Sequence, residues 1–241
     1  MRNLLPLFAA AALFGCSDKP ANTLRVGTEA AYFPFEFQES GEIKGFDVDL
    51  MKAVAREMGR PVDIQNSEFQ GLVPGLKTEK FDAVISCVTI TEERKKEVDF
   101  SDPYYDAGQI VAVRADEKDI RSKDDLKGKR IGAQSNTTGL AQAKTLGGSQ
   151  VKEYEDVNMA FQDLLNGQID AVVNDEPVSR RLAAMKPGFK CVGEIFTKEQ
   201  YGIVVRKGDA ALLAEINNAL KKVRDSGELE KLKEKWITKP K

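Results

Sequence analysis

The chain has 241 residues, 41% of them hydrophobic and 31% charged, so it is long enough for one large domain or two small ones and too apolar to be disordered throughout. Its formal net charge of −2 argues against a nucleic-acid binder, and the absence of histidine excludes Ser-His-Asp triads, histidine bases and histidine-ligated metals. The three cysteines include no C-x-x-C pair, so we expect neither a metal centre nor another cofactor.

Residues 1–15 are predicted to be a lipoprotein signal peptide. Arg2 precedes an apolar stretch that ends in small residues, which is the layout of a secretory signal, and the stretch is shorter than the roughly 20 residues of a membrane span. Its end, Leu-Phe-Gly-Cys, resembles the bacterial lipobox, although Phe14 is larger than the residues common there. Cys16 is therefore the predicted lipid attachment site, and the alternative is an ordinary signal followed by a chance cysteine.

Residues 16–22 follow as a polar, proline-containing tether. An acylated cysteine anchors a protein stably, because each buried methylene contributes about 0.8 kcal/mol. We expect an exported protein, located in the periplasm or at the cell surface and held at a membrane through Cys16.

The rest of the chain is predicted to alternate strands and helices. Apolar residues at 50, 51, 54, 55 and 58 have helical spacing, which predicts a helix over 47–58 that stops at Gly59. Residues 158–165 show the same spacing, with Gly167 just beyond. Strands that alternate with helices favour an α/β fold with parallel sheets.

Two sequence patterns occur twice, in the same order. Arg25–Glu29 (RVGTE) corresponds to Arg130–Gln134 (RIGAQ), and residues 76–85 correspond to residues 164–173. Each copy of the second pattern places an aspartate directly before a short apolar strand; these are Asp82 and Asp170. The alternative is a chance repetition of short motifs, but the shared order predicts two similar lobes.

Polar or small residues follow the paired strands of this repeat. In open α/β sheets, ligands collect beyond the carboxyl ends of strands. Any one of these residues could be an ordinary loop residue, but their equivalent positions in the two halves predict a shared cleft between the lobes. The residues are Glu29 and Gln134, then Ser86–Cys87 and Asn174–Asp175.

Four segments carry a family resemblance: GTEAAYFPFEF (27–37), GFDVDLMKAVA (45–55), VTITEERKKEVDFSDPYY (88–105) and GKRIGAQSNTTG (128–139). From about residue 23 onward, the chain resembles the polar amino-acid solute-binding proteins of bacterial ABC importers, extracellular solute-binding protein family 3. The resemblance implies a two-lobe periplasmic-binding-protein fold of type II. Each lobe would be a mixed, mostly parallel sheet flanked by helices, and two hinge strands would join the lobes.

The predicted boundaries follow from the repeat and this resemblance. Residues 23–107 plus 202–241 are expected to form the first lobe, and residues 108–201 the second. The hinges are expected at 106–108 and 196–201.

A free amino acid carries a carboxylate and an ammonium group, and the resemblance assigns a partner to each. Arg94 would hold the carboxylate, since a guanidinium binds it bidentately and Thr91 is a plausible cap for a short helix there. The alternative is a surface arginine in a charged run. Asp175 would accept the ammonium, or merely cap the helix before Pro177. The amides of Thr137 and Thr138 would meet the carboxylate from the other lobe, although the family commonly has glycine at Asn136.

Other residues are assigned to the ligand side chain. The resemblance places Tyr32 and Phe69 beside it, with Ser86, Cys87 and Thr89 along the same strand end. A disulfide from Cys87 to Cys191 would obstruct closure of the lobes, so it is not favoured. Glu29 at the end of the first strand favours a cationic side chain, because charge pairs strengthen in a desolvated cleft. Gln134 could hydrogen-bond to an amide or to a guanidinium, so glutamine remains a second candidate ligand.

The predicted function is the substrate-binding component of an ABC amino-acid importer, without enzymatic activity. It would capture a free L-amino acid, arginine or lysine first and glutamine next, and deliver it as a monomer to a permease in the inner membrane. One alternative is a cyclohexadienyl dehydratase-like enzyme on the same fold, with Glu29 or Asp175 as the general acid. A ligand-sensing module is the other, but a receptor would need a transmembrane segment, and none is predicted before the final Lys-Pro-Lys.

Overall fold

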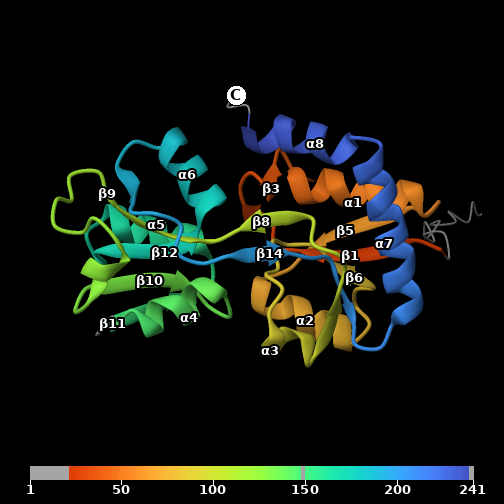
Figure 1. The fold of residues 1–241 in the computed structure, drawn as a ribbon, viewed down its shortest axis with the longest axis horizontal. Helices are drawn as coiled ribbons and strands as arrows, with labels where there is room; N and C mark the ends of the chain where they lie inside the picture. The colour runs from red at the N-terminus through yellow and green to blue at the C-terminus, as the bar shows by residue number, and fades with distance from the viewer. Residues whose placement is uncertain (1–21, 148–149, 239–241) are drawn as a thin grey trace, which may run out of the picture.

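Two five-stranded sheets form the centres of two lobes in a computed structural model, which describes residues 22–147 and 150–238 (Figure 1). The sheet of the first lobe has the order β5-β1-β6-β15-β7, and that of the second has the order β11-β10-β12-β9-β13. In both sheets three parallel strands are followed by a fourth strand that is antiparallel to its neighbours on both sides. The predicted two-lobe α/β fold is confirmed; the exact lobe boundaries stay predictions.

The strands of the first sheet are short, and most of their apolar residues are buried. They are β1 (Leu24–Thr28), β5 (Val62–Asn66), β6 (Ala83–Val84), β7 (Val98–Phe100) and β15 (Val204–Arg206). The helices of this lobe are α1 (Phe46–Glu57), α2 (Phe69–Lys77), α3 (Glu92–Lys95), α7 (Ala210–Asp225) and α8 (Glu228–Lys233), followed by a π-helical turn over Glu234–Thr238. The helix predicted over 47–58 is α1, displaced by one residue.

The second sheet has the same plan. Its strands are β9 (Gln109–Arg114), β10 (Arg130–Gln134), β11 (Gln150–Tyr154), β12 (Ala171–Asp175) and β13 (Phe189–Val192). Its helices are α4 (Thr138–Thr145), α5 (Val157–Leu165) and α6 (Glu176–Met185), with a 3-10 turn over Lys123–Leu126. The helix predicted over 158–165 is α5. Nowhere in residues 22–147 or 150–238 is there a helix with the length and apolar character of a membrane span.

The sequence repeat has a direct structural counterpart in each lobe. Asp82 accepts hydrogen bonds from the backbone N and the guanidinium of Arg25 at 2.6 to 3.1 Å. Asp170 accepts the equivalent bonds from Arg130 at 2.7 to 3.1 Å. The pair joins the start of one strand to the start of its parallel neighbour in both sheets. The repeated residues therefore set the register of the sheets.

The glycines of RVGTE and RIGAQ are needed for close packing. A Cβ on Gly27 would come within 2.7 Å of the Phe81 ring, and one on Gly132 within 2.5 Å of Ile169. Phe81 and Ile169 each stand directly before the repeated aspartate. Packing of these large side chains onto bare backbone explains why the two motifs occur together.

Two antiparallel strands connect the lobes, and both run between them in Figure 1. They are β8 (Tyr105–Ala107) and β14 (Glu199–Tyr201). The rings of Tyr105 and Tyr201 stack with centroids 5.8 Å apart, and Phe35 meets both edge-on. Such aromatic pairs add to the stabilisation from burial alone. The connecting strands are thus seated on an aromatic cluster in the first lobe.

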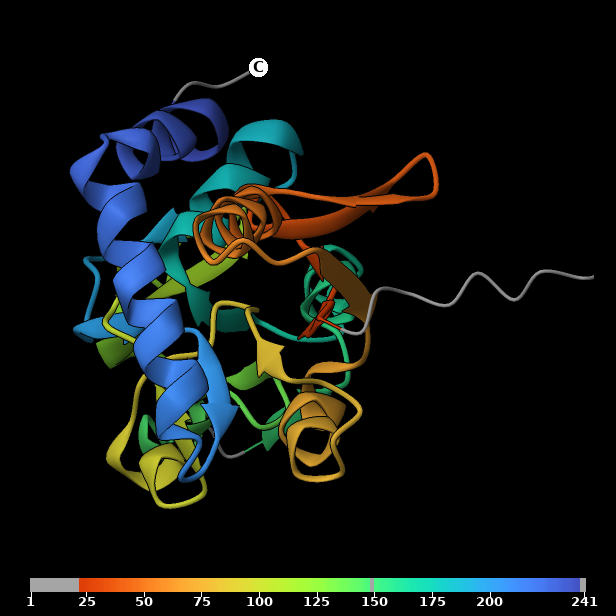
Figure 2. The ribbon, with the colours of Figure 1, turned by 90° about the vertical axis from the view of Figure 1, so that its right-hand side faces the viewer.

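A three-stranded hairpin sheet covers one side of the first lobe. It consists of β2 (Ala31–Tyr32), β3 (Glu36–Glu39) and β4 (Glu42–Lys44), and the β3–β4 turn projects beyond α1 in Figure 2. Burial changes sharply along β3, because Glu36 is buried whereas Glu39 is exposed. One end of the hairpin therefore belongs to the interior next to the cleft.

Candidate ligand-binding site

A cavity lies between the lobes and is lined by both of them. Its free volume is about 20 Å³, little more than one water molecule needs, because the lining side chains fill the closed cleft. All eleven residues predicted to contact a ligand line it: Glu29, Tyr32, Phe69, Ser86, Cys87, Thr89, Arg94, Gln134, Thr137, Thr138 and Asp175. Three further lining residues were not among them: Glu36, Gly139 and Asn174.

Direct hydrogen bonds cross the cleft, so the lobes are closed on one another. Gln134 of the second lobe donates from Nε2 to both carboxylate oxygens of Glu29, at 2.8 Å each. The hydroxyl of Tyr32 donates to Oδ1 of Asn174 at 2.8 Å. Because these bonds join side chains that line the cavity, a ligand entering it would compete with them.

Arg94 lies in the first turn of α3, as predicted. Thr91 caps this short helix by accepting a hydrogen bond from the Arg94 backbone N at 3.1 Å. The guanidinium donates to the carbonyl oxygens of Thr89 and Asn136, both at 2.8 Å, and lies 5.6 Å from the centre of the Phe69 ring. A guanidinium has five N–H donors, so those two bonds fix its plane and leave others for an anion. Burial lowers the pKa of Arg94, and the nearby acids oppose that effect.

Asp175 ends strand β12 and is buried, with 8% of its surface exposed. It accepts a hydrogen bond from the Tyr201 hydroxyl at 2.5 Å and another from Nε2 of Gln109. Asp175 occupies the N-cap position of α6, but its side chain makes no capping hydrogen bond, so helix capping does not account for this carboxylate. Burial, reinforced by the charge of Glu199, raises the pKa of Asp175 to about 6. A ligand ammonium would restore its charged form.

The loop before α4 turns at Asn136, where the family commonly has glycine. Asn136 has a positive φ of 61°, which asparagine tolerates better than most residues. Thr137 caps α4 by accepting from the Leu140 backbone N at 3.1 Å. The hydroxyl of Thr138 donates to Glu199 at 2.8 Å. The start of α4 therefore faces the cavity beside the connecting strand β14.

Glu29 follows strand β1 and is 7% exposed. Besides the two bonds from Gln134, it accepts a long bond of 3.4 Å from the backbone N of Phe69. Burial raises its pKa to about 7, and the hydrogen bonds only partly offset this shift. The side chain therefore lies in the cavity as a carboxyl group whose charge is poorly compensated.

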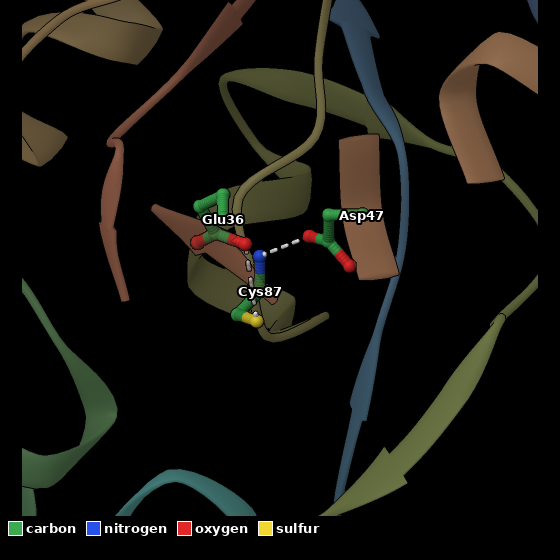
Figure 3. A group of neighbouring side chains, drawn as sticks. All are labelled: Glu36, Asp47 and Cys87. Carbon is green, nitrogen blue, oxygen red and sulfur yellow. Dashed lines mark hydrogen bonds between the residues drawn. The ribbon is translucent and has the colours of Figure 1, made fainter. Parts of the chain in front are cut away.

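Ser86 and Cys87 connect the cavity to a group of buried acids behind it. Ser86 Oγ accepts from the Glu29 backbone N at 2.9 Å and donates to Glu36 at 3.1 Å. Cys87 donates from its backbone N to Asp47 Oδ2 at 2.9 Å (Figure 3). The thiols of Cys87 and Cys191 are both free. Hydrogen-bond donors already occupy Asp47 Oδ2 and a Glu36 oxygen, so we do not assign a metal to this group.

The remaining contacts that shape the site could not be selected from the sequence alone. Glu199 on β14 accepts from Thr89 of the first lobe at 3.0 Å and from Thr138 of the second. Glu36 and Asp47 lie within the quoted segments FPFEF and GFDVDL, but nothing in those letters shows that the two acids meet. The repeat already places Asn174 at the predicted cleft, although Asn174 is not among the eleven predicted ligand contacts.

The chain belongs to the bacterial extracellular solute-binding proteins, family 3, which match residues 24–239. A probable histidine-binding protein of Neisseria gonorrhoeae is 38% identical over 229 residues, covering 91% of this chain and 85% of the relative. The ABC transporter arginine-binding protein 1 of Escherichia coli (strain K12) is 37% identical over 246 residues, covering 97% and 98%. The family is extracellular, which places the chain in the periplasm or at the cell surface.

Solved structures agree with this assignment. An ancestral arginine-binding protein bound to glutamine superimposes with a TM-score of 0.87 at 44% identity, covering 92% of this chain and 100% of its own. The arginine-bound form of an ancestral arginine-binding protein gives 0.86 at 45%, covering 89% and 98%. An ancestral amino acid-binding protein, described as a precursor of cyclohexadienyl dehydratase, gives 0.85 at 42%, covering 90% and 96%. These comparisons define an amino-acid-binding component of an ABC transporter.

Proposed function

We propose that this protein captures a cationic amino acid, arginine or lysine, and delivers it to its permease, with glutamine as the next candidate. The observation that carries the proposal is the charge of the cavity. Its lining includes the acids Glu29, Glu36 and Asp175 but a single cation, Arg94. One of these acids would pair with the ligand ammonium, and Arg94 would pair with the ligand carboxylate. Negative charge then remains in the cavity to pair with the ligand side chain.

Each of these groups can be assigned to one part of an amino acid. Arg94 and the start of α4 would hold the carboxylate, and Asp175 the ammonium. Glu29 would receive the distal charge, with Gln134 released from its present bonds to the carboxylate. Tyr32 and Phe69 would flank the alkyl chain. The amide of Gln134 and the glutamine-bound structural neighbour are the reasons to keep glutamine as the second candidate.

Binding is favoured over catalysis. The structural neighbour related to cyclohexadienyl dehydratase is itself described as an amino acid-binding protein. Moreover, Arg94 and Asp175 form a complete pair for a zwitterion, which leaves neither free to act on a substrate.

A thermal-shift panel of the twenty amino acids and ornithine tests the proposal. A ligand that binds only the folded protein raises the melting temperature by mass action. Arginine, lysine and ornithine should give the largest increases, followed by glutamine. Larger increases with acidic or apolar amino acids, and none with the cations, would refute the assignment.

Lipid attachment at Cys16 is part of the proposal and lies outside the described residues. The lipid would hold the protein near the membrane that carries its permease, while residues 16–22 would let the lobes reach it. We propose that the protein acts there as a monomer.

The preference for arginine over glutamine should depend on pH. In the closed cleft without a cation, burial raises the pKa of Glu29 to about 7, and a cation beside it would lower that pKa. Closure on glutamine therefore lets Glu29 take up a proton below pH 7 whereas closure on arginine keeps it ionised, so the affinity for arginine relative to glutamine should fall by roughly tenfold or more between pH 8 and 5.5. Protonation of Asp175 affects the binding of both ligands equally. Titration calorimetry of arginine and glutamine in parallel therefore isolates the contribution of Glu29 to the pH dependence. Identical pH profiles would contradict this role.

Ligand binding should shift the protein toward the closed arrangement. The hydrogen bonds that cross the cleft, such as those from Gln134 to Glu29, Tyr32 to Asn174 and Arg94 to Asn136, are polar contacts that water can replace. In solution the free lobes should therefore separate about β8 and β14. Small-angle X-ray scattering should show a smaller radius of gyration at saturating arginine. An unchanged scattering profile, with occupancy established by calorimetry, would argue against closure.

A further inference from the structure

A pair of buried carboxyl groups lies directly behind the cavity. Glu36 at the start of β3 is 1% exposed and Asp47 in the first turn of α1 is 0% exposed. Figure 3 shows the two side chains on either side of Cys87. One oxygen from each carboxylate and the sulfur of Cys87 come within 4.8 Å of one another.

The hydrogen bonds of the pair leave one atom unexplained. Asp47 Oδ2 accepts from the Cys87 backbone N at 2.9 Å and from the Tyr104 hydroxyl at 2.7 Å. Glu36 accepts from the Ser86 hydroxyl and, at 3.8 Å, from the Cys87 thiol. The other oxygen of Asp47, Oδ1, is buried and has no donor. A buried carboxylate oxygen without a donor is costly, so a proton is expected nearby.

Among the residues that the structure describes, the strongest electrostatic influences on the two carboxylates include no positive charge. The titratable groups that act on the pair are Glu29 after β1, Tyr32 in β2, Cys87 after β6 and Tyr104 before β8. Each of them is neutral or acidic. Two adjacent carboxylates in such a site cannot both ionise.

We infer that Glu36 and Asp47 share one proton, which Glu36 carries and donates to the Asp47 carboxylate, and that this bond positions Ser86 and Cys87 at the edge of the ligand cavity. Asp47 is the ionised member because its Oδ2 has two donors of its own. Glu36, through Ser86, and Asp47, through the Cys87 backbone, are thus positioning residues. The pair also adds one negative charge to the cleft rather than two.

The pKa values have the direction that this arrangement requires. Burial, with the charge of Asp47, raises the pKa of Glu36 well above its usual value, and burial raises that of Asp47 to about 6. An acid with a higher pKa in the folded protein makes folding take up a proton. Stability is then greatest below the unfolded pKa, about 4.3 for glutamate, and falls as pH rises toward the folded pKa.

The test is the pH dependence of unfolding of the ligand-free protein. Because unfolding releases the shared proton, the unfolding equilibrium constant should rise about tenfold per pH unit between about pH 4.5 and neutrality. The amide of Glu36→Gln can still donate to Asp47, so this variant should stay folded and its Cys87 amide should remain protected from hydrogen exchange. The dependence of its unfolding free energy on pH should be smaller by one proton. Glu39→Gln, on the exposed end of the same strand, is the matched control and should keep the wild-type slope. Equal slopes in wild type and Glu36→Gln would overturn the inference.

A second measurement needs no variant. The side-chain carboxyl ¹³C resonance of Glu36 in the wild-type protein should have the shift of a protonated acid at pH 7, and the shift of an ionised one would refute the proposal. Zinc ions should leave the melting temperature unchanged. If zinc instead raised it in the wild type but not in Glu36→Gln, a metal rather than a proton would neutralise the pair. None of these readouts uses an amino acid, so they are independent of the proposed ligand.

Discussion

Replacing Arg94 with alanine should abolish most of the affinity for the amino acid, with a loss of about 30-fold or more. The guanidinium is held in one plane by the carbonyls of Thr89 and Asn136 and keeps further donors free for a carboxylate. Removing it would leave the carboxylate of a bound ligand buried without its charged partner. Loss of one member of such a pair costs about 2–5 kcal/mol.

Calorimetry with arginine on the purified variant measures this loss. Arg94→Lys should recover little, since an ammonium cannot bind a carboxylate bidentately. Arg121→Ala is a suitable control, because Arg121 is exposed and does not line the cavity. Near-normal affinity in Arg94→Ala would mean that the cavity is not the ligand site. Asp175→Asn should also weaken binding, but less, because the amide keeps one acceptor.

Replacing Glu29 with glutamine should change which ligand the protein prefers. A hydrogen bond to a charged group contributes about 1.5–3 kcal/mol, so arginine and lysine should lose about 10- to 150-fold in affinity. The affinity for glutamine should fall little or rise, because binding would no longer bury a carboxylate against the neutral amide of the ligand. The change is nearly isosteric, and Gln134 can still hydrogen-bond to the new side chain.

Parallel titrations of arginine, lysine and glutamine distinguish this role from a structural one. If Glu29 only holds the loop that follows β1, all three ligands should weaken equally. Equal losses, or no loss for the two cations, would contradict the role of Glu29 in charge selection. Melting temperatures of the parent and the variant, measured without ligand, show whether the fold is intact.

Much of the fold could be predicted because its determinants are local. The apolar spacing in α1 and α5 specifies each helix to within one residue. The repeated Arg–Asp pairs and the glycines beside Phe81 and Ile169 are short motifs whose chemistry is visible in the letters. The site residues that end strands, such as Glu29 and Asp175, follow from the same patterns, because parallel strands bring their carboxyl ends together.

The contacts between distant segments could not be predicted. The buried pair of Glu36 and Asp47 depends on the way the hairpin folds back onto α1, and both residues read as ordinary surface acids in the sequence. Glu199 meets Thr89 and Thr138 only because the connecting strand β14 passes between the lobes. Neither juxtaposition has a local signal, since the residues are far apart in the chain or separated by a turn.

The sequence by itself determined the class of protein, the two-lobe plan and eleven of the fourteen residues that line one cavity. These depend on strand and helix periodicity and on motifs in which neighbouring residues act together. Only the tertiary structure decided the protonation chemistry of the site. The pKa values of Glu29, Glu36 and Asp175 depend on burial and on the charges around them, and both quantities exist only once distant segments have packed together.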